Sequence, residues 1–378
     1  MAWSRWVMTL KVVCVSFVGM SGSQVWAQDV PFSDWQHASP DRVLEFPRDH
    51  ASHPAFRIEW WYYTGNLDAA AGRRFGYQVT FFRVGVDPAP ANPSRWAVRD
   101  LYMAHLALTD LENGRHLFDE RLNRAGGGWA GARADRLEVW NEDWRLSGDG
   151  STHALELASE DAGFGLTLSL VENRPPVLHG GNGFSQKGMA VGNASHYYSL
   201  TRMPTTGEVR IGDETFAVSG SSWMDHEFGT SFLEPSQQGW DWFSLQLDDG
   251  TDLMVYQLRQ LDGTAHARSA GTVVAADGTT RTLGVKDYRL TPGRVWTSPT
   301  SAAAYPVEWR VEVPSASLDL SVHAVVDAQE LHTEDSTGVT YWEGSVRVTG
   351  THRGQAVTGR GYLELTGYAG QPLSEVLR

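Results

Sequence analysis

The sequence of 378 residues contains almost no cysteine, and its single thiol is Cys14. That residue lies within the first 27 residues, which have the pattern of a signal peptide. Without that segment, no thiol remains to form a disulfide or a thiolate metal site. The rest of the chain must therefore fold by burying a hydrophobic core, and it is long enough to do so.

Positive charge is also scarce. The sequence has 31 Lys and Arg against 45 Asp and Glu, which gives a formal net charge of -14. Such acidity disfavours binding to phosphate backbones and to anionic membrane surfaces. We therefore expect no nucleic-acid partner.

Long hydrophobic runs and convincing amphipathic helices are missing as well. The apolar stretch Val12–Met20 follows Arg5 and Lys11 and is too short to span a bilayer as a permanent helix. The segment Val25–Ala27 then fits a cleavage site. These features predict a cleaved signal peptide at residues 1–27, no stable membrane insertion, and a periplasmic or secreted mature chain.

Patterns with a period of two dominate the remaining sequence. Alternation of apolar and polar residues is typical of β-strands with one buried face, and Gly-Asp turns separate many of the segments. Many short strands of this kind predict an all-β fold built from barrels or sandwiches. The expected strands are Arg57–Leu67, Phe75–Val84, Asp100–Leu108, Leu137–Leu146, Ala154–Ala158, Gly165–Val171, His196–Met203, Trp240–Leu247, Asp252–Gln260, Val307–Val313, Ser317–His323, Gly344–Thr349 and Gly361–Thr366.

Two pairs of segments indicate an internal duplication. When Trp60 is aligned with Trp240, similar residues follow in both copies, and each second strand ends on Arg. Further along, VSGSSWMDHEFG (Val218–Gly229) aligns without gaps on VTGRGYLELTGY (Val357–Tyr368). Chance similarity between amphipathic strands is the alternative. Duplication predicts two tandem β domains, at residues 43–232 and 233–378.

The second alignment places a histidine on an apolar strand face. Leu363 and Leu365 share one face, and their equivalents in the first copy are Met224 and His226. If His226 points inward, its neighbour Asp225 points to the other face. His226 would then be a proton donor or a polar anchor in an apolar cavity. A core histidine bonded to a backbone carbonyl is the alternative. A metalloprotease zinc motif is excluded, because a threonine stands four residues after His226.

The stretch RIEWWYYTGNL (Arg57–Leu67) has aromatic residues on both of its faces. Glu59 would be an acid in an apolar wall, with its pKa raised by desolvation. A structural salt bridge to Arg83 is the alternative. The second half repeats the aromatic theme. The predicted ligand-binding side chains are Trp60, Tyr62, Tyr63, Trp223, Trp240, Trp242 and Tyr256.

Other motifs are weak. His50 and His53 could ligate a metal, but we interpret them as polar residues of an exposed loop and predict no metal site. The segment Gly183–Gly188 has neither the spacing of a nucleophile elbow nor that of a phosphate loop.

Five blocks together resemble one protein family. They are HPAFRIEWWYYTGNL, GYQVTFFR, SHYYSLTRMPTTGEV, SSWMDHEFG and GWDWFSLQLDDGTDLMVYQLR. They are similar to the carotenoid 1,2-hydratase (hydroxyneurosporene synthase) family, and more closely to its secreted bacterial branch of "predicted secreted hydrolases". The resemblance runs from about His53 to Tyr368. It implies two tandem lipocalin-like antiparallel β-barrels that hold an elongated apolar substrate between them.

The resemblance also implies an activity, the hydration of an isoprenoid or polyene-like lipid. Protonation of carbon needs a strong acid in a dry site and a water to trap the cation. We assign Asp225 or Glu59 as the acid and His226 as the relay, with no cofactor required. We expect His226→Leu to leave the fold intact and to abolish turnover. A lipid carrier working with an ABC-type transporter is the alternative, and a hydrolase ranks last.

Overall fold

A computed structural model describes residues 34–92, 94, 97–190, 192–231, 233–370, 372 and 373. The predicted signal peptide, including Cys14, lies outside these residues. Strands dominate the described chain, and the predicted all-β fold is confirmed. None of the described helices is long and apolar enough to cross a membrane. The short 3₁₀ helices are η2 (Arg48–His50), η3 (Ala70–Gly72) and η4 (Pro314–Ala316).

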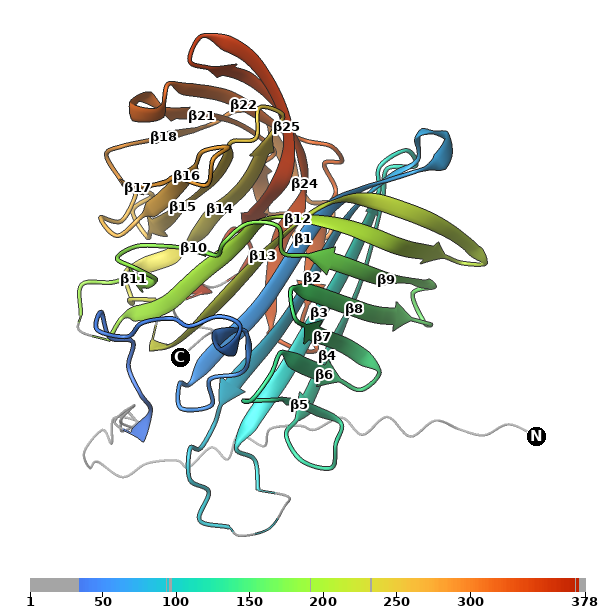
Figure 1. Cartoon of the computed structure of the whole chain (residues 1–378), viewed down its shortest axis with the longest axis vertical. Coiled ribbons are helices and arrows are strands. Elements are labelled where there is room, and N and C mark those ends of the chain that lie inside the picture. The colour runs from blue at the N-terminus through green and yellow to red at the C-terminus, as the bar shows by residue number, and fades with distance from the viewer. Residues whose placement is uncertain are drawn as a thin grey trace, which may run out of the picture. The chain divides into compact units, whose positions relative to one another are not determined.

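The first half forms a 13-stranded antiparallel sheet that nearly closes into a barrel. Its order is β4-β3-β2-β1-β13-β12-β9-β8-β7-β6-β5, with β10 and β11 pairing with β12. Figure 1 shows β1 and β13 side by side. The strands are β1 (Ile58–Ala69), β2 (Arg74–Gly85), β3 (Asp100–Asp110), β4 (Arg115–Arg124), β5 (Ala130–Ala132), β6 (Glu138–Asn141), β7 (Trp144–Asp149), β8 (Thr152–Ser159), β9 (Phe164–Val171), β10 (Val177–Leu178), β11 (Phe184–Gln186), β12 (Ala194–Ile211) and β13 (Glu214–Ser231).

The second half forms a 10-stranded antiparallel sheet. Its order is β17-β16-β15-β14-β25-β24-β22-β21-β18, β23 pairs with β24, and β19 and β20 form a separate pair. These strands run from yellow to red in Figure 1. They are β14 (Gln237–Leu247), β15 (Asp252–Gln260), β16 (Ala270–Val274), β17 (Thr280–Gly284), β18 (Arg289–Pro292), β19 (Val295–Thr297), β20 (Ala304–Pro306), β21 (Glu308–Val313), β22 (Leu318–Ala324), β23 (Glu330–Thr333), β24 (Val339–His352) and β25 (Gln355–Leu365).

The two sheets have matching strand orders. In the first, β1 lies between β2 and β13, and in the second, β14 lies between β15 and β25. The aligned glycines Gly220 and Gly359 have the same packing reason to lack a side chain. A Cβ at Gly220 would lie 2.1 Å from the backbone oxygen of Asn66, and one at Gly359 would lie 2.5 Å from that of Gln246. The similarity between the aligned segments therefore reflects shared strand packing.

Residues of β1 alternate between two hydrophobic clusters. Trp61 and Tyr63 are fully buried in the core of the first sheet. Trp60 and Tyr62 instead belong to a cluster formed by residues of both sheets. The alternation arises because successive strand side chains point to opposite faces. One aromatic face thus stabilises the first barrel, and the other packs against the second sheet.

Polar contacts also join the two sheets. The buried carboxylate of Asp252 on β15 accepts hydrogen bonds from Thr201 and Arg202 on β12 and from Arg174. Another bond joins His105 Nδ1 and the Tyr341 hydroxyl across 2.8 Å. Since buried charges are stable only when paired, these contacts fix how the sheets pack.

Candidate functional site

Glu59 lies inside the first barrel and is fully buried. It forms a salt bridge to Arg83, with Nε 3.1 Å from Oε2. Burial alone would raise the pKa of Glu59, but hydrogen bonds from His226 and His53 and the charge of Arg83 lower it well below its ordinary value. The prediction of an acid with a raised pKa is therefore wrong for Glu59, and the salt-bridge alternative describes it.

His226 is fully buried on the same inner face. Its Nε2 lies 3.0 Å from Glu59 Oε1 and its Nδ1 lies 2.9 Å from the Tyr198 hydroxyl. Burial lowers the pKa of His226, although the neighbouring carboxylate opposes that shift. The indole of Trp61 stacks on the imidazole with ring centroids 4.9 Å apart. His226 points inward, as the alternation of side chains along the strand predicts. Its hydrogen-bond partners are side chains, and not the backbone carbonyl of the alternative interpretation.

Asp225 points to the opposite face of β13, away from His226. Its carboxylate accepts hydrogen bonds from the Tyr197 hydroxyl, the Ser199 hydroxyl and, at 2.6 Å, Trp223 Nε1. Burial raises the pKa of Asp225 to about 7, although these donors oppose the shift. The sheet therefore separates Asp225 from both His226 and Glu59. The predicted site therefore does not form as one unit. His226 and Glu59 lie on the inner face of the first sheet, and Asp225 lies on the opposite face.

Most of the predicted ligand-binding side chains meet in one place. We call this set the aromatic cluster. Tyr63 lies outside it, because it faces the core of the first sheet and lies 2.8 Å from His153 Nδ1. The cluster consists of Tyr62, Tyr197, Trp223, Trp242, Met254, Tyr256, Leu258 and Tyr362, with Trp60, Leu233, Trp240 and Ala270 packed against it.

Two glutamates beside the aromatic cluster were not among the predicted site residues. Glu343 on β24 and Glu364 on β25 lie directly opposite each other in the strand register. Side chains in such positions have Cβ atoms about 5 Å apart. Burial and then the Glu364 charge raise the pKa of Glu343 well above its ordinary value. Burial, with the charges of Asp225 and Glu227, raises the pKa of Glu364 to about 7. Since Glu364 is half-buried and Glu343 is only 2 % exposed, Glu343 holds its proton more firmly.

A signal for this pair was present in the repeat. The alignment matches Glu364 with Asp225, which the sequence predicts as a possible acid. In the first copy, Asp225 lies opposite Ser199, whose hydroxyl donates to it. In the second copy, a second carboxyl group, Glu343, takes the place of that hydroxyl. Two adjacent carboxyl groups in a dry site cannot both ionise easily, so one of them retains a proton.

Unpartnered polar atoms mark the same position. The Tyr62 hydroxyl and the Glu343 carboxyl group interact with each other, but neither that hydroxyl nor Glu343 Oε1 forms a hydrogen bond of ordinary geometry, and both side chains are more than nine-tenths buried. Buried polar groups are normally satisfied by protein or water. A phenol and a carboxyl group facing aromatic rings can therefore bind a small polar group, such as a water or a substrate hydroxyl.

The buried ammonium group of Lys187 lies against the aromatic cluster. Lys187 Nζ lies 3.0 Å from Glu227 Oε1 and 4.7 Å and 4.3 Å from the ring centroids of Tyr197 and Tyr256. This ion pair and the two cation–π contacts hold the rings in place. The cluster therefore combines aromatic faces with fixed charges.

Comparison with known proteins places this architecture in a family. The AttH-like family matches residues 37–368. The chain belongs to that family. An AttH protein from Nitrosomonas europaea of known crystal structure is similar, with 36% sequence identity and a TM-score of 0.80, over 88% of this chain and 100% of that one. No curated protein matches the sequence.

More distant structures share the fold of this AttH-like chain. Kievitone hydratase from Nectria haematococca has 18% identity and a TM-score of 0.66, over 86% of this chain and 93% of that one. CghA has 14% identity and a TM-score of 0.51, over 84% and 89% of the two chains. At these identities the likeness concerns the fold alone, and it agrees with the lipocalin-like architecture that the sequence resemblance implies.

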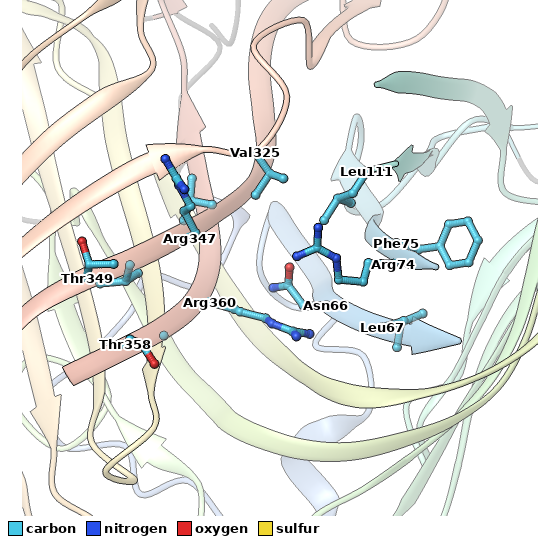
Figure 2. Close-up of a pocket in the computed structure, with 13 residues that line it drawn as sticks. Asn66, Leu67, Arg74, Phe75, Leu111, Val325, Arg347, Thr349, Thr358 and Arg360 are labelled. Atoms are coloured by element: carbon cyan, nitrogen blue, oxygen red, sulfur yellow. The ribbon is translucent and has the colours of Figure 1, made fainter. Parts of the chain in front are cut away.

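A cavity of about 210 Å³ occurs elsewhere in the AttH-like chain, between β1 and β2 and the pair β24 and β25. Figure 2 shows the guanidinium groups of Arg74 and Arg360 directed toward the space near Asn66, whereas that of Arg347 points away. Arg74 pairs with Glu112, and Arg360 with Asp68. None of the predicted site residues lines this cavity.

Proposed function

We propose that this AttH-like protein is an exported, hydratase-like enzyme that adds water across a carbon–carbon double bond of an elongated apolar ligand of isoprenoid or polyene type. The observation that carries the proposal is the pair Glu343 and Glu364, because it supplies a carboxylic acid with a raised pKa beside the aromatic cluster. The hydratase among the fold neighbours and the resemblance to carotenoid 1,2-hydratases support the same reaction class.

The proposed reaction begins with proton transfer from Glu343 to one alkene carbon. The π electrons form the new C–H bond, and the other carbon becomes a cation. Faces of rings such as Tyr62 and Trp242 stabilise this cation, each by about 1–2 kcal/mol in a dry site. Water then forms the C–O bond and loses its extra proton to the carboxylate pair, which restores Glu343. Alkene and water alone are consumed, so the reaction requires no redox cofactor.

Asp225 has a positioning role in this proposal. Its two oxygens already accept hydrogen bonds from Tyr197, Ser199 and Trp223. These bonds orient the rings of the cluster and, by stabilising the carboxylate, limit how fully Asp225 is protonated at neutral pH. Burial raises the pKa of Glu343 well above its ordinary value and that of Asp225 only to about 7, so Glu343 is the group that carries the proton to the alkene in this proposal.

The test begins with the natural ligand. The protein is purified from the periplasm of its own host, its bound small molecule is identified by native mass spectrometry, and that molecule is incubated with fresh enzyme in ¹⁸O-labelled water. We expect the product to gain one labelled water, and Glu343→Gln to lower the rate by about 10²–10⁴-fold. The matched control Glu160→Gln changes an exposed side chain and should leave the rate unchanged.

A lipid carrier that delivers its ligand to an ABC-type transporter is the second candidate. The aromatic cluster favours it, because residues of both sheets can hold an apolar molecule without any chemistry. The same experiment separates the two functions. Stoichiometric ligand that is recovered without a gain of water, in wild type and in Glu343→Gln alike, would exclude the hydratase and support the carrier.

A further inference from the structure

Three side chains form a second polar centre inside the first barrel, separate from the aromatic cluster. They are His50 on η2, His153 on β8 and Glu172, which follows β9. The Nε2 atoms of His50 and His153 lie 3.4 Å and 3.0 Å from the same oxygen, Glu172 Oε1. All three possible ligand atoms lie within 4.8 Å of one another. The sequence analysis placed His50 and His53 in an exposed loop, which is wrong, because they are 3 % and 9 % exposed.

Tyrosine hydroxyls orient both histidines from the other side of each ring. His50 Nδ1 lies 2.7 Å from the Tyr198 hydroxyl, and His153 Nδ1 lies 2.8 Å from the Tyr63 hydroxyl. In metal sites, the second ring nitrogen of a ligating histidine is usually held by such a partner. The imidazoles are therefore fixed with their Nε2 atoms directed toward Glu172.

The hydrogen bonds that link Glu59, His226, Tyr198 and His50 leave Nε2 of His50 without a proton. His226 Nε2 faces the Glu59 carboxylate, which cannot donate, so Nε2 carries the proton of that ring and Nδ1 is an acceptor. The single proton of the Tyr198 hydroxyl then goes to His226 Nδ1 or to the carbonyl oxygen of Asp49, 3.2 Å away. Tyr198 must accept the proton of His50 Nδ1, which leaves a lone pair on His50 Nε2. That atom has no hydrogen-bond partner, although the side chain is 97 % buried.

We propose that His50, His153 and Glu172 form a binding site for a zinc ion. Two imidazole nitrogens and one carboxylate oxygen are a donor set that zinc prefers when a fourth position remains open. Tetrahedral coordination with bonds of about 2.05 Å separates ligand atoms by about 3.3 Å, which agrees with the 3.0 Å and 3.4 Å observed. The side chain of Glu172 is 15% exposed, so solvent can reach the open position.

The neighbouring trio His53, Glu59 and His226 is a poorer site. Its possible ligand atoms also lie within 4.8 Å of one another. In both trios a histidine nitrogen bonds to the shared carboxylate, but in this one the guanidinium of Arg83 also contacts that carboxylate. This positive charge repels a cation, whereas Glu172 forms no ion pair with an arginine or lysine of the described residues. Zinc should therefore distinguish the two centres.

Zinc binding can be measured on the untagged chain without any substrate. Titration with zinc chloride, followed by desalting and elemental analysis, should give one zinc per chain, and cobalt(II) should give the visible absorption of a tetrahedral site. Glu172→Gln should weaken zinc binding at least tenfold, and His153→Gln at least 100-fold. Circular dichroism establishes that each variant is folded.

The matched control removes a histidine from the other centre. His53→Gln should keep both the stoichiometry and the cobalt spectrum. Loss of zinc in His53→Gln with retention in folded Glu172→Gln and His153→Gln would overturn the proposal, as would the absence of stoichiometric zinc in wild type. Neither result bears on turnover at Glu343, so the zinc site and the proposed hydratase function are tested independently of each other.

Discussion

At the scale of single residues, adjacent side chains of β13 have opposite electrostatic environments. His226 faces the first barrel, where burial lowers its pKa, and Asp225 faces the aromatic cluster, where burial raises its pKa. Both shifts have the same cause, since burial disfavours the charged form of either group. A titratable residue in this fold must therefore be interpreted from the face it occupies.

His226→Leu tests the structural role of the histidine. The contacts revise the expectation that this variant leaves the fold intact. Leucine would remove one hydrogen bond from the buried Glu59 carboxylate and one from the buried Tyr198 hydroxyl, so we expect the free energy of unfolding to fall by about 3 kcal/mol. Met224→Leu, on the same buried face, should cost about 1 kcal/mol or less. Urea denaturation measures both, and equal values for the two variants would refute the role of these hydrogen bonds.

Glu343→Gln tests the raised pKa of Glu343 through the pH dependence of stability. Above about pH 4.5 the unfolded chain loses this proton while the folded chain keeps it, so wild-type stability falls as pH rises. Glutamine removes that dependence. Relative to wild type, the variant should gain up to about 1.4 kcal/mol per pH unit above pH 4.5. Denaturation curves from pH 5 upward, with exposed Glu160→Gln as the control, should show this slope, and a slope of the opposite sign would count against the account.

At the scale of strands, the aligned glycines allow close packing between neighbours. Gly220→Ala and Gly359→Ala would place a methyl group against the backbone of β1 and of β14 respectively. Backbone cannot move aside as a flexible side chain can, so we expect each variant to lose about 2 kcal/mol or more of stability. Gly181→Ala, where no atom lies within 4 Å of the new Cβ, is the control. Thermal melts that are unchanged in Gly220→Ala would show that the strands adjust freely.

Strand patterns predicted much of the fold and only part of the site. Alternation correctly separated His226 from Asp225, because orientation on a strand depends only on local geometry. The partners of Glu59 could not be predicted, since His53 and Arg83 reach it from other elements. For the same reason, a glutamate such as Glu343 had no local signal of its own. The side chains that a residue meets across a sheet depend on register, which a single sequence leaves open.

At the scale of the whole molecule, the two sheets share buried charge. Asp252 of the second sheet is fully buried and forms salt bridges to Arg174 and Arg202. Removing one member of such a network leaves uncompensated charge, which costs about 3–5 kcal/mol. The sheets should therefore unfold together in the intact protein.

Asp252→Asn tests this coupling. Differential scanning calorimetry should show one transition in wild type, and a lower midpoint with a broadened or divided transition in the variant. Asp135→Asn, at a side chain that is 72% exposed, should resemble wild type. Two separate transitions in wild type would show that the sheets are independent.

The central claim is that Glu343 holds a proton at neutral pH beside the aromatic cluster. Difference infrared spectroscopy of wild type and Glu343→Gln at pH 7 measures this directly, because a protonated carboxyl group has a carbonyl band that a carboxylate lacks. The account predicts a stronger band in wild type than in the variant, where Asp225 and Glu364, with pKa values raised to about 7, still contribute to it. A wild-type spectrum at pH 7 with carboxylate bands alone would contradict the account.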